Sequence, residues 1–424
     1  MHSHIADFAD SQSLVALVEG LAVRPDADLF LSAPERAGAG PCRIGLAPCA
    51  EILVEPGTPR EAIAEFLFAT PGTSLGCLTY DYGLSLRGVV SDKMPWCPPG
   101  RFRRYRALVV FDPATGELRA EGDTDYARAA VAEALRPTLA AAPSAPSGTG
   151  GTGTQRASLG REGYMRGVEE VLERIRGGYT YQLCLSSEFA VHAPDLDPAG
   201  LFVRLWRECP APFYALFRLG PVTVISTSPE RFLRVADGEV LSQPIKGTLA
   251  FDEYRPELAE RVTSSPKESA ELSMIVDLIR NDISANCEYG SVRVDGHKST
   301  FVVDNLIQMY TNVRGRLRAD RTCLDLLLDA FPGGSVTGCP KLASMGIIEE
   351  LEPHTRGVYC GSMVVVEDAR NMESSIAIRT AVHDSRDGVF RHHAGSGIVV
   401  DSDPESEYLE TLAKAGKFAR LAGL

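Results

Sequence analysis

Two stretches of the sequence carry glutamates at helical spacing. Glu268 and Glu271 lie three residues apart in SPKESAELSMIVDLIRND. Glu407 and Glu410 lie three residues apart near the C-terminal end, and Lys414 follows one turn later. Residues three or four apart share one side of a helix, so two such helices could jointly hold a hard cation such as Mg²⁺. Spacing alone leaves open the alternative of two solvated acidic faces.

Two loops could receive an anion. FPGGSVTGCPK, residues 331–341, offers backbone amides and the hydroxyls of Ser335 and Thr337. It does not match a nucleotide-binding phosphate loop, because Cys339 and Pro340 separate the second glycine from the lysine. HAGSGIVVD, around residues 395–397, could let a carboxylate approach the backbone closely. Plain turns remain the alternative for both loops.

One amine stands in a loop-like segment, LSQPIKGT, where Lys246 lies between a proline and a Gly-Thr pair. Such a lysine is usually a solvated charge, and it becomes a nucleophile only when it is desolvated near another cation. The ten cysteines show neither a C-x-x-C pair nor zinc spacing with histidines. His392 and His393 are adjacent on a strand-like segment, point to opposite faces and are interpreted as structural.

The elements that must position these groups alternate along the chain. Residues 161–178 have the apolar spacing of a helix, whereas 179–191, 213–219 and 222–228 are typical of strands. Helices interleaved with alternating strands favour an α+β fold. Residues 140–156 lack apolar periodicity and predict a flexible linker between an N-terminal segment, 1–139, and a catalytic domain, 157–424.

Composition narrows the class of protein. The 424 residues carry 43 Lys and Arg against 56 Asp and Glu, a net charge of −13. This sign disfavours binding to nucleic acid or to acidic membrane surfaces. No apolar run reaches the roughly 18 residues of a membrane-spanning helix, and the N-terminus lacks a signal-peptide pattern. We therefore expect a cytoplasmic enzyme or binding protein with no nucleic-acid or membrane partner.

Eight segments, taken in order, resemble the chorismate-utilising enzymes. The segments are YQLCLSSEF, STSPERFL, PIKGT, ELSMIVDLIRND, FPGGSVTGCPKLASM, RGVYCGSM, IAIRTAV and AGSGIVVDSDPESEYLETLAKA. They extend over everything after the linker. The first 140 residues match only through GCLTYDYG and the VVFD strand. The resemblance implies two large packed β-sheets flanked by helices, with the N-terminal segment in the same sandwich.

The resemblance also implies Mg²⁺ as cofactor and chorismate, a dicarboxylate, as substrate. A dianion is well held by a divalent ion at one end and a guanidinium at the other. By position, Glu271 and Glu410 are expected as metal ligands, with Glu268 and Glu407 in or just behind the first shell of ligands. Expected substrate-binding residues are Gly247, Thr248, Thr337, Tyr359, Arg379, Gly395, Ser396, Gly397 and Lys414. Expected catalytic residues are Lys246, Gln182, Asn305 and Ser335.

Two positions indicate the branch of the family. Isochorismate and salicylate synthases carry a water-activating lysine where this chain has Gln182, so a hydroxylating reaction is disfavoured. At residues 244–248 this chain has PIKGT, the form found in aminodeoxychorismate synthases, whereas anthranilate synthases have a motif like PIAGT at this place. The resemblance thus implies amination of chorismate to 4-amino-4-deoxychorismate, with the amine of Lys246 attacking the ring before ammonia displaces it. The product would serve p-aminobenzoate synthesis for folate or an antibiotic.

Asn305 departs from the family pattern, which has a histidine associated with proton transfer and pyruvate loss. Asparagine has no useful proton affinity near neutral pH, so pyruvate elimination is disfavoured. A 2-amino-2-deoxyisochorismate synthase, an anthranilate synthase component I and a non-catalytic sensor of chorismate or tryptophan remain alternatives; a nucleotide-binding protein is a weaker one. The chain shows no glutaminase-type nucleophile turn, so we expect ammonia from solution or from a separate glutamine amidotransferase subunit.

Overall fold

The structure, a computed structural model, describes residues 3–7, 11–33, 40–136, 155–251, 253–303 and 306–422. The helices are α1(Ser11–Ala22), α2(Arg60–Phe68), α3(Tyr80–Leu86), α4(Thr124–Ala134), α5(Arg161–Arg176), α6(Pro198–Glu208), α7(Pro256–Thr263), α8(Pro266–Ser284), α9(Cys323–Ala330), η1(Gly334–Val336), α10(Lys341–Leu351) and α11(Pro404–Ala422). The strands are β1(Ser3–Asp7), β2(Ala27–Ser32), β3(Cys42–Leu53), β4(Ser74–Leu78), β5(Gly100–Phe111), β6(Glu117–Gly122), β7(Arg156–Ala157), β8(Gln182–His192), β9(Phe213–Leu219), β10(Val222–Ser226), β11(Arg231–Ala236), β12(Glu239–Gln243), β13(Ile245–Ala250), β14(Arg293–Val303), β15(Leu306–Arg316), β16(Gly338–Cys339), β17(Ser362–Asp368), β18(Asn371–Ile376), β19(Thr380–Asp384) and β20(Val389–Ile398).

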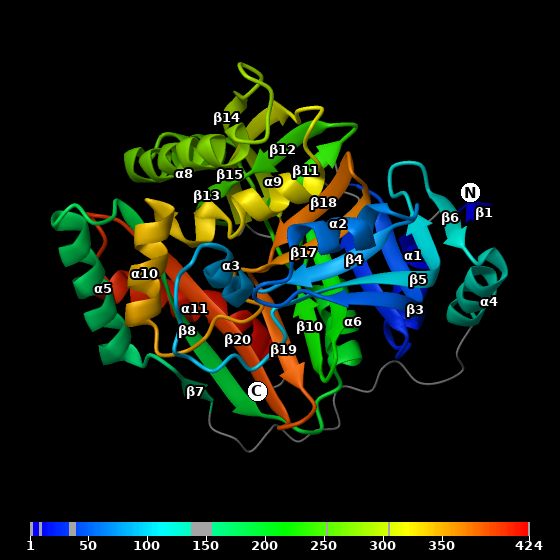
Figure 1. The fold of residues 1–424 in the computed structure, drawn as a ribbon. Coiled ribbons are helices and arrows are strands. Elements are labelled where there is room, and N and C mark those ends of the chain that lie inside the picture. The colour runs from blue at the N-terminus through cyan, green and yellow to red at the C-terminus, as the bar shows by residue number, and fades with distance from the viewer. Residues whose placement is uncertain are drawn as a thin grey trace.

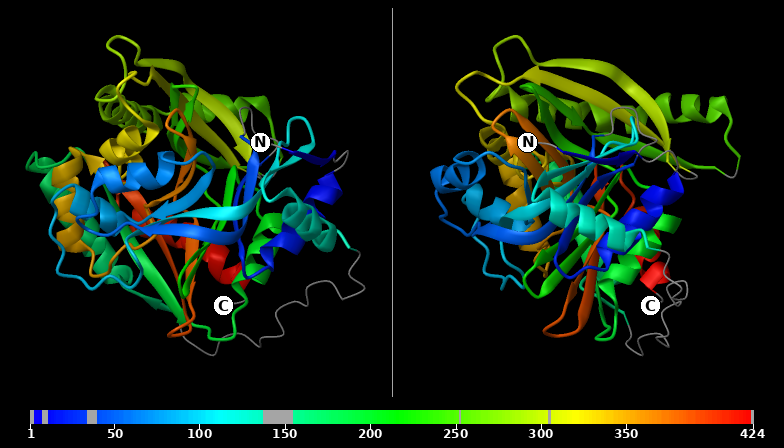
Figure 2. Two further views of the ribbon diagram at one scale, coloured as in Figure 1. Left: turned by 45° about the vertical axis from the view of Figure 1, so that its right-hand side comes forward. Right: turned by 90° about the vertical axis from the view of Figure 1, so that its right-hand side faces the viewer.

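The strands form one antiparallel hydrogen-bonded network with two arms that meet at β5. The first arm continues from β5 through β3, β2, β9, β10, β19 and β20 to β8. The second arm continues through β4, β17, β18, β11 and β12 to β15, which also pairs with β13 and β14. Figures 1 and 2 show the strands of the N-terminal part, in blue, lying beside strands from the rest of the chain.

The two arms pack face to face. Phe30 and Phe217 of the first arm share one buried apolar cluster with Leu75 and Val365 of the second arm. Helices α1, α4 and α6 cover the outer face of the first arm, and α2, α8 and α9 cover that of the second arm, whereas α10 packs against β8 and β16. The expected α+β fold of two packed sheets flanked by helices is therefore confirmed. No described helix is both long and apolar enough to span a bilayer.

The N-terminal part is joined to the rest of the fold through strand pairing. Strand β2 pairs with β9, and β4 pairs with β17. The expected linker, 140–156, lies outside the described residues except for Gln155 and Arg156. The division into residues 1–139 and 157–424 stays a prediction, since both parts contribute strands to one network.

The two glutamate-bearing helices are carried by different arms. Helix α8 packs against β13 and β15, whereas α11 packs against β20 and α5. Each helix has a capping residue at its start: the hydroxyl of Ser265 accepts a hydrogen bond from the backbone of Glu268, and the carboxylate of Asp403 accepts one from the backbone of Ser406. Proline occupies the first position of both helices, where its missing N–H has no intrahelical partner to lose. The fold thus brings two acidic helices toward each other from opposite layers.

Glycine on the exposed side of α10 gives a test of this helix. A Cβ at Gly346 would meet nothing within 4 Å, so we expect Gly346→Ala to raise the free energy of unfolding by about 0.5–1 kcal/mol. The contrasting variant is Gly315→Ala on β15, where a Cβ would lie 2.6 Å from Cys287 Sγ, and it should destabilise the fold. Urea titration of both variants checks the pair, and a loss of stability in Gly346→Ala would contradict the prediction.

Candidate active site

A cavity of about 750 Å³ lies between the glutamate-bearing helices and the strands that face them. Its walls come from β13, α8, η1, β20 and α11, together with the segments around Tyr359 and Arg379. Many of the residues expected from the sequence line it. They are Lys246, Gly247, Glu268, Glu271, Ser335, Tyr359, Arg379, Gly395, Gly397, Glu407, Glu410 and Lys414. Segments more than 150 residues apart in the chain therefore meet at one site.

Carboxylates occupy two sides of this cavity. Glu268 and Glu271 come from α8, and Glu407 and Glu410 come from α11. Glu271 is 8% exposed and Glu407 is 4% exposed, although neither stands in an apolar cluster. Burial of carboxylates is unfavourable unless they have hydrogen bonds or a cation nearby. The hydroxyl of Ser402 donates to Glu407 Oε1 at 2.7 Å.

The donor set suits a hard divalent cation. Carboxylate oxygens are the ligands that Mg²⁺ prefers, and the ion commonly keeps several waters while binding one or two protein carboxylates plus an anionic substrate. Among the described residues, no three His, Cys, Asp or Glu side chains stand close enough to form a ready-made metal cage. An ion held by one or two of these carboxylates would take the rest of its ligand shell from water or from a bound anion. On α11, Glu410 also pairs with Lys414 at 2.6 Å.

Lys246 lines the cavity, and the buried Gln182 lies beside it without lining the cavity itself. Strand β13 has a register shift between Lys246 and Thr248, and Gly247 adopts a φ of +71° there. A bulge of this kind changes the direction of the neighbouring side chains. A Cβ built on Gly397 would lie 3.0 Å from Gln182 Nε2 and 3.3 Å from Lys246 Nζ. The amine and the amide thus share the space left by one glycine of β20.

That shared space gives a second test. Gly397→Ala places a methyl group against the Gln182 amide and the Lys246 amine, at contacts tighter than van der Waals. We expect kcat/KM for the reaction at this site to fall about tenfold, because small displacements of reacting groups lower the rate strongly. Steady-state kinetics with chorismate, the substrate that the sequence resemblance implies, checks the value, and Gly346→Ala is the matched control. Full activity in Gly397→Ala would contradict the close approach of Gln182 and Lys246 to this glycine.

Cationic and phenolic side chains line the same cavity, beside the glutamates. Arg379 is half-buried, has the left-handed φ of +51° that strains a non-glycine residue, and donates from Nη1 to the carbonyl of Lys414 at 3.1 Å. Desolvation lowers the pKa of Arg379 from its ordinary value, but an arginine remains cationic near neutral pH. Lys414 Nζ donates to the carbonyl of Gly395 at 3.0 Å. Burial raises the pKa of Tyr359 well above 10, so the phenol stays neutral and can donate.

The structure does not bring every expected side chain to the cavity. Thr337 Oγ1 donates to the carbonyl of Gly333 at 3.1 Å, and the Ser396 hydroxyl bonds to that of Tyr164 at 3.0 Å. Both side chains are buried in the fold, and neither lines the cavity. Asn305 and the side chain of Thr248 lie outside the described residues.

Two residues that were not expected at the site from the sequence, Glu230 and His393, also line the cavity. Glu230 belongs to the SPERF segment and accepts a hydrogen bond from Ser335 Oγ at 2.6 Å. The signal in the sequence is a carboxylate at the very start of a strand whose following residues are buried. His393 lines the cavity as well, while the adjacent His392 stacks on Phe189. The two side chains point to opposite faces of β20, as expected from the sequence. The structural interpretation of His393 did not include its place in the cavity wall.

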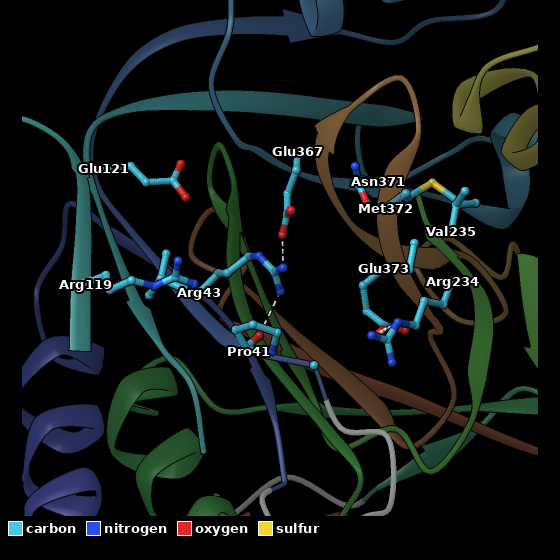
Figure 3. Close-up of a pocket in the computed structure, with 13 residues that line it drawn as sticks. Pro41, Arg43, Arg119, Glu121, Arg234, Val235, Glu367, Asn371, Met372 and Glu373 are labelled. Carbon is cyan, nitrogen blue, oxygen red and sulfur yellow. Dashed lines mark hydrogen bonds and ion pairs between the residues drawn. The ribbon is translucent and has the colours of Figure 1, made fainter. Parts of the chain in front are cut away.

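A second, smaller cavity of about 250 Å³ lies near the junction of β3, β6, β11 and β18 (Figure 3). Its charged side chains largely pair with one another: Arg43 binds Glu367, and Arg234 lies 3.9 Å from Glu373. None of the residues expected from the sequence lines it. The larger cavity is the candidate active site.

These features define an α+β protein with a cavity between two sheet arms that is lined by both acidic and basic side chains. A sequence profile of the chorismate binding enzyme family matches residues 38–420, and the chain belongs to that family.

Individual relatives agree with this assignment. Aminodeoxychorismate synthase component 1 of Klebsiella aerogenes is 41% identical over 273 residues, which cover 63% of this chain and 59% of the relative. Aminodeoxychorismate synthase of Streptomyces griseus is 34% identical over 377 residues, covering 85% and 52%. The chain thus spans less than two thirds of the length of either relative. The crystal structure of anthranilate synthase component I from Streptococcus pneumoniae TIGR4 superposes with a TM-score of 0.77 at 26% identity, covering 94% of this chain and 93% of that one.

Proposed function

We propose that the protein aminates chorismate to 4-amino-4-deoxychorismate. The single observation that carries this proposal is the position of Lys246, which lines the cavity together with the glutamates and Arg379 and has its amine beside the Gln182 amide. The names of the Klebsiella aerogenes and Streptomyces griseus relatives support the same reaction.

The cavity is matched to a dicarboxylate. Arg379, Tyr359 and Lys414 offer cationic and neutral donors to one carboxylate. The other carboxylate would face the glutamates, where like charges repel unless a cation lies between them. We propose Mg²⁺ held by Glu271 and Glu410, with Glu268 and Glu407 adjoining. When bound, the ion would neutralise the substrate carboxylate and polarise the ring.

The residues of this chain then account for the exchange of hydroxyl for amine. Lys246 Nζ attacks the ring diene, the double bonds shift, and the C–O bond to the ring hydroxyl breaks. Glu230, which the hydroxyl of Ser335 orients, lies in the cavity as a group able to give the departing oxygen its proton. Ammonia next bonds to the carbon that lost the hydroxyl, the double bonds return, and the C–N bond to Lys246 breaks. Chorismate and ammonia thus yield the product and water.

Gln182 favours ammonia over water as the incoming nucleophile. Its amide cannot remove a proton from water, and its side chain is 1% exposed beside Lys246. We propose that ammonia reaches the cavity from a separate glutamine amidotransferase subunit, and that added ammonium can replace it.

Product identity tests the proposed function. The protein is incubated with chorismate, Mg²⁺ and ammonium chloride at mildly alkaline pH, and the product is identified by mass spectrometry and NMR. We expect the amino group at the ring carbon that carried the hydroxyl, with the enolpyruvyl group retained. An ortho-amino product would instead identify an anthranilate or 2-amino-2-deoxyisochorismate synthase and would refute the proposal.

A further inference from the structure

His393 forms part of the cavity wall next to the anion-binding residues. Its ring is 6% exposed and stacks on the phenol of Tyr359, with ring centroids 5.2 Å apart and an angle of 9° between the planes. Near-parallel aromatic contacts of this kind are favourable beyond the area that they bury. One face of the Tyr359 ring is therefore fixed by the imidazole.

The imidazole itself cannot turn freely. Nε2 lies 3.3 Å from the carbonyl of Thr355 and 3.5 Å from Glu188 Oε2. Both neighbours accept hydrogen bonds only, so Nε2 carries the proton in this arrangement. The ring of His354 lies 5.3 Å away, and burial together with His354 holds the pKa of His393 well below 6.5. His393 is thus a neutral ring with its orientation set by the backbone.

Tyr359 has a second, independent anchor. The guanidinium of Arg356 lies 5.8 Å from the centre of the Tyr359 ring. Arg356 is fully buried and binds Glu352 at 2.7 Å, while Glu352 also accepts hydrogen bonds from the backbone and hydroxyl of Ser186. This network fixes Arg356 independently of His393, so the contact of Arg356 with the Tyr359 ring remains when His393 is replaced.

We propose that His393 is a positioning residue, which holds the Tyr359 phenol at the cavity wall in the orientation that binds a substrate carboxylate. It acts through Tyr359 and makes no direct contribution to bond formation. The inference rests on the proposed binding of chorismate in this cavity. It makes His393 a determinant of substrate affinity rather than of the rate of amination.

Equilibrium binding of chorismate tests the inference. Titrations are made by calorimetry with Mg²⁺ and without ammonia, in a Lys246→Met background so that no bond forms to the protein. We expect His393→Ala to raise the Kd about five- to tenfold, the range of one aromatic contact. His393→Phe keeps the stacked ring and should change the Kd by less than about twofold. Equal losses in the two variants would overturn the stacking role.

A double-mutant cycle separates positioning from a general structural effect. In a Tyr359→Phe background, which lacks the hydroxyl, His393→Ala should add less than about a twofold change, because the group that it positions is gone. The control is His383→Ala, since His383 is equally buried and bonds to the carbonyl of Ala193 at 3.0 Å but does not line the cavity. Additive losses, or a similar loss in His383→Ala, would overturn the inference. Failure of the proposed function would differ, since it would appear in the unmutated protein as absence of chorismate binding or as a different product.

Discussion

Lys246→Ala is expected to lower kcat for 4-amino-4-deoxychorismate at least about a thousandfold, because removing a covalent nucleophile leaves only binding and electrostatic contributions. The amine is positioned by the bulge at Gly247 and by the gap at Gly397. Chorismate binding should change little, since the carboxylate-binding groups stay in place. Steady-state kinetics with ammonium, with product separated by chromatography, measures the effect.

The control for this variant is a lysine outside the cavity. Lys298 lies in the irregular part of β14 with a φ of +63°, and Lys298→Asn places there a residue that tolerates this conformation. It should retain wild-type kinetics. If Lys246→Ala kept more than about a tenth of the wild-type rate, Lys246 would not be the nucleophile.

Glu407→Gln is expected to weaken Mg²⁺ binding and to reduce amination about a hundredfold. Glu407 is buried, its carboxylate accepts from the hydroxyl of Ser402, and it faces the cavity from α11. The substitution preserves size and hydrogen bonding but removes the negative charge that a divalent ion requires. Calorimetric titration of Mg²⁺ at saturating chorismate gives a readout that is independent of turnover.

Glu405→Gln on the same helix is the matched control. Glu405 pairs with Arg161 on the protein surface and does not line the cavity. Its replacement should leave both Mg²⁺ affinity and kcat within about twofold, as expected for an exposed ion pair. Equal effects of the two substitutions would remove Glu407 from the metal site.

Helical periodicity made the acidic part of the site predictable from the sequence. The spacing of Glu268 and Glu271, and of Glu407 and Glu410, places each pair on one side of its helix, and the caps at Ser265 and Asp403 determine where those helices begin. The alternation of helices and strands likewise indicated an α+β fold. Such signals are local, so a single sequence can carry them.

The rest of the site depends on contacts that no local pattern encodes. The bulge beside Lys246 arises in the pairing of β13 with β15, which are separated in the chain by two helices and one strand. Glu230, just before β11, and His393, in the middle of β20, line the cavity because strands from both arms border it. Thr337 and Ser396 stand in motifs that suggested ligand binding, yet their hydroxyls satisfy Gly333 and Tyr164 instead. Whether a hydroxyl is available to a ligand or is used inside the protein depends on its burial, and burial is determined by the complete fold.

Trapping the covalent intermediate tests the central claim most directly. The protein is incubated with chorismate and Mg²⁺ without any ammonia source, quenched, digested and mapped by mass spectrometry. We expect the peptide that contains Lys246 to gain the mass of chorismate less one water, and the gain to disappear when ammonium is added before quenching. Absence of this adduct, or an adduct confined to Lys414, would contradict the account.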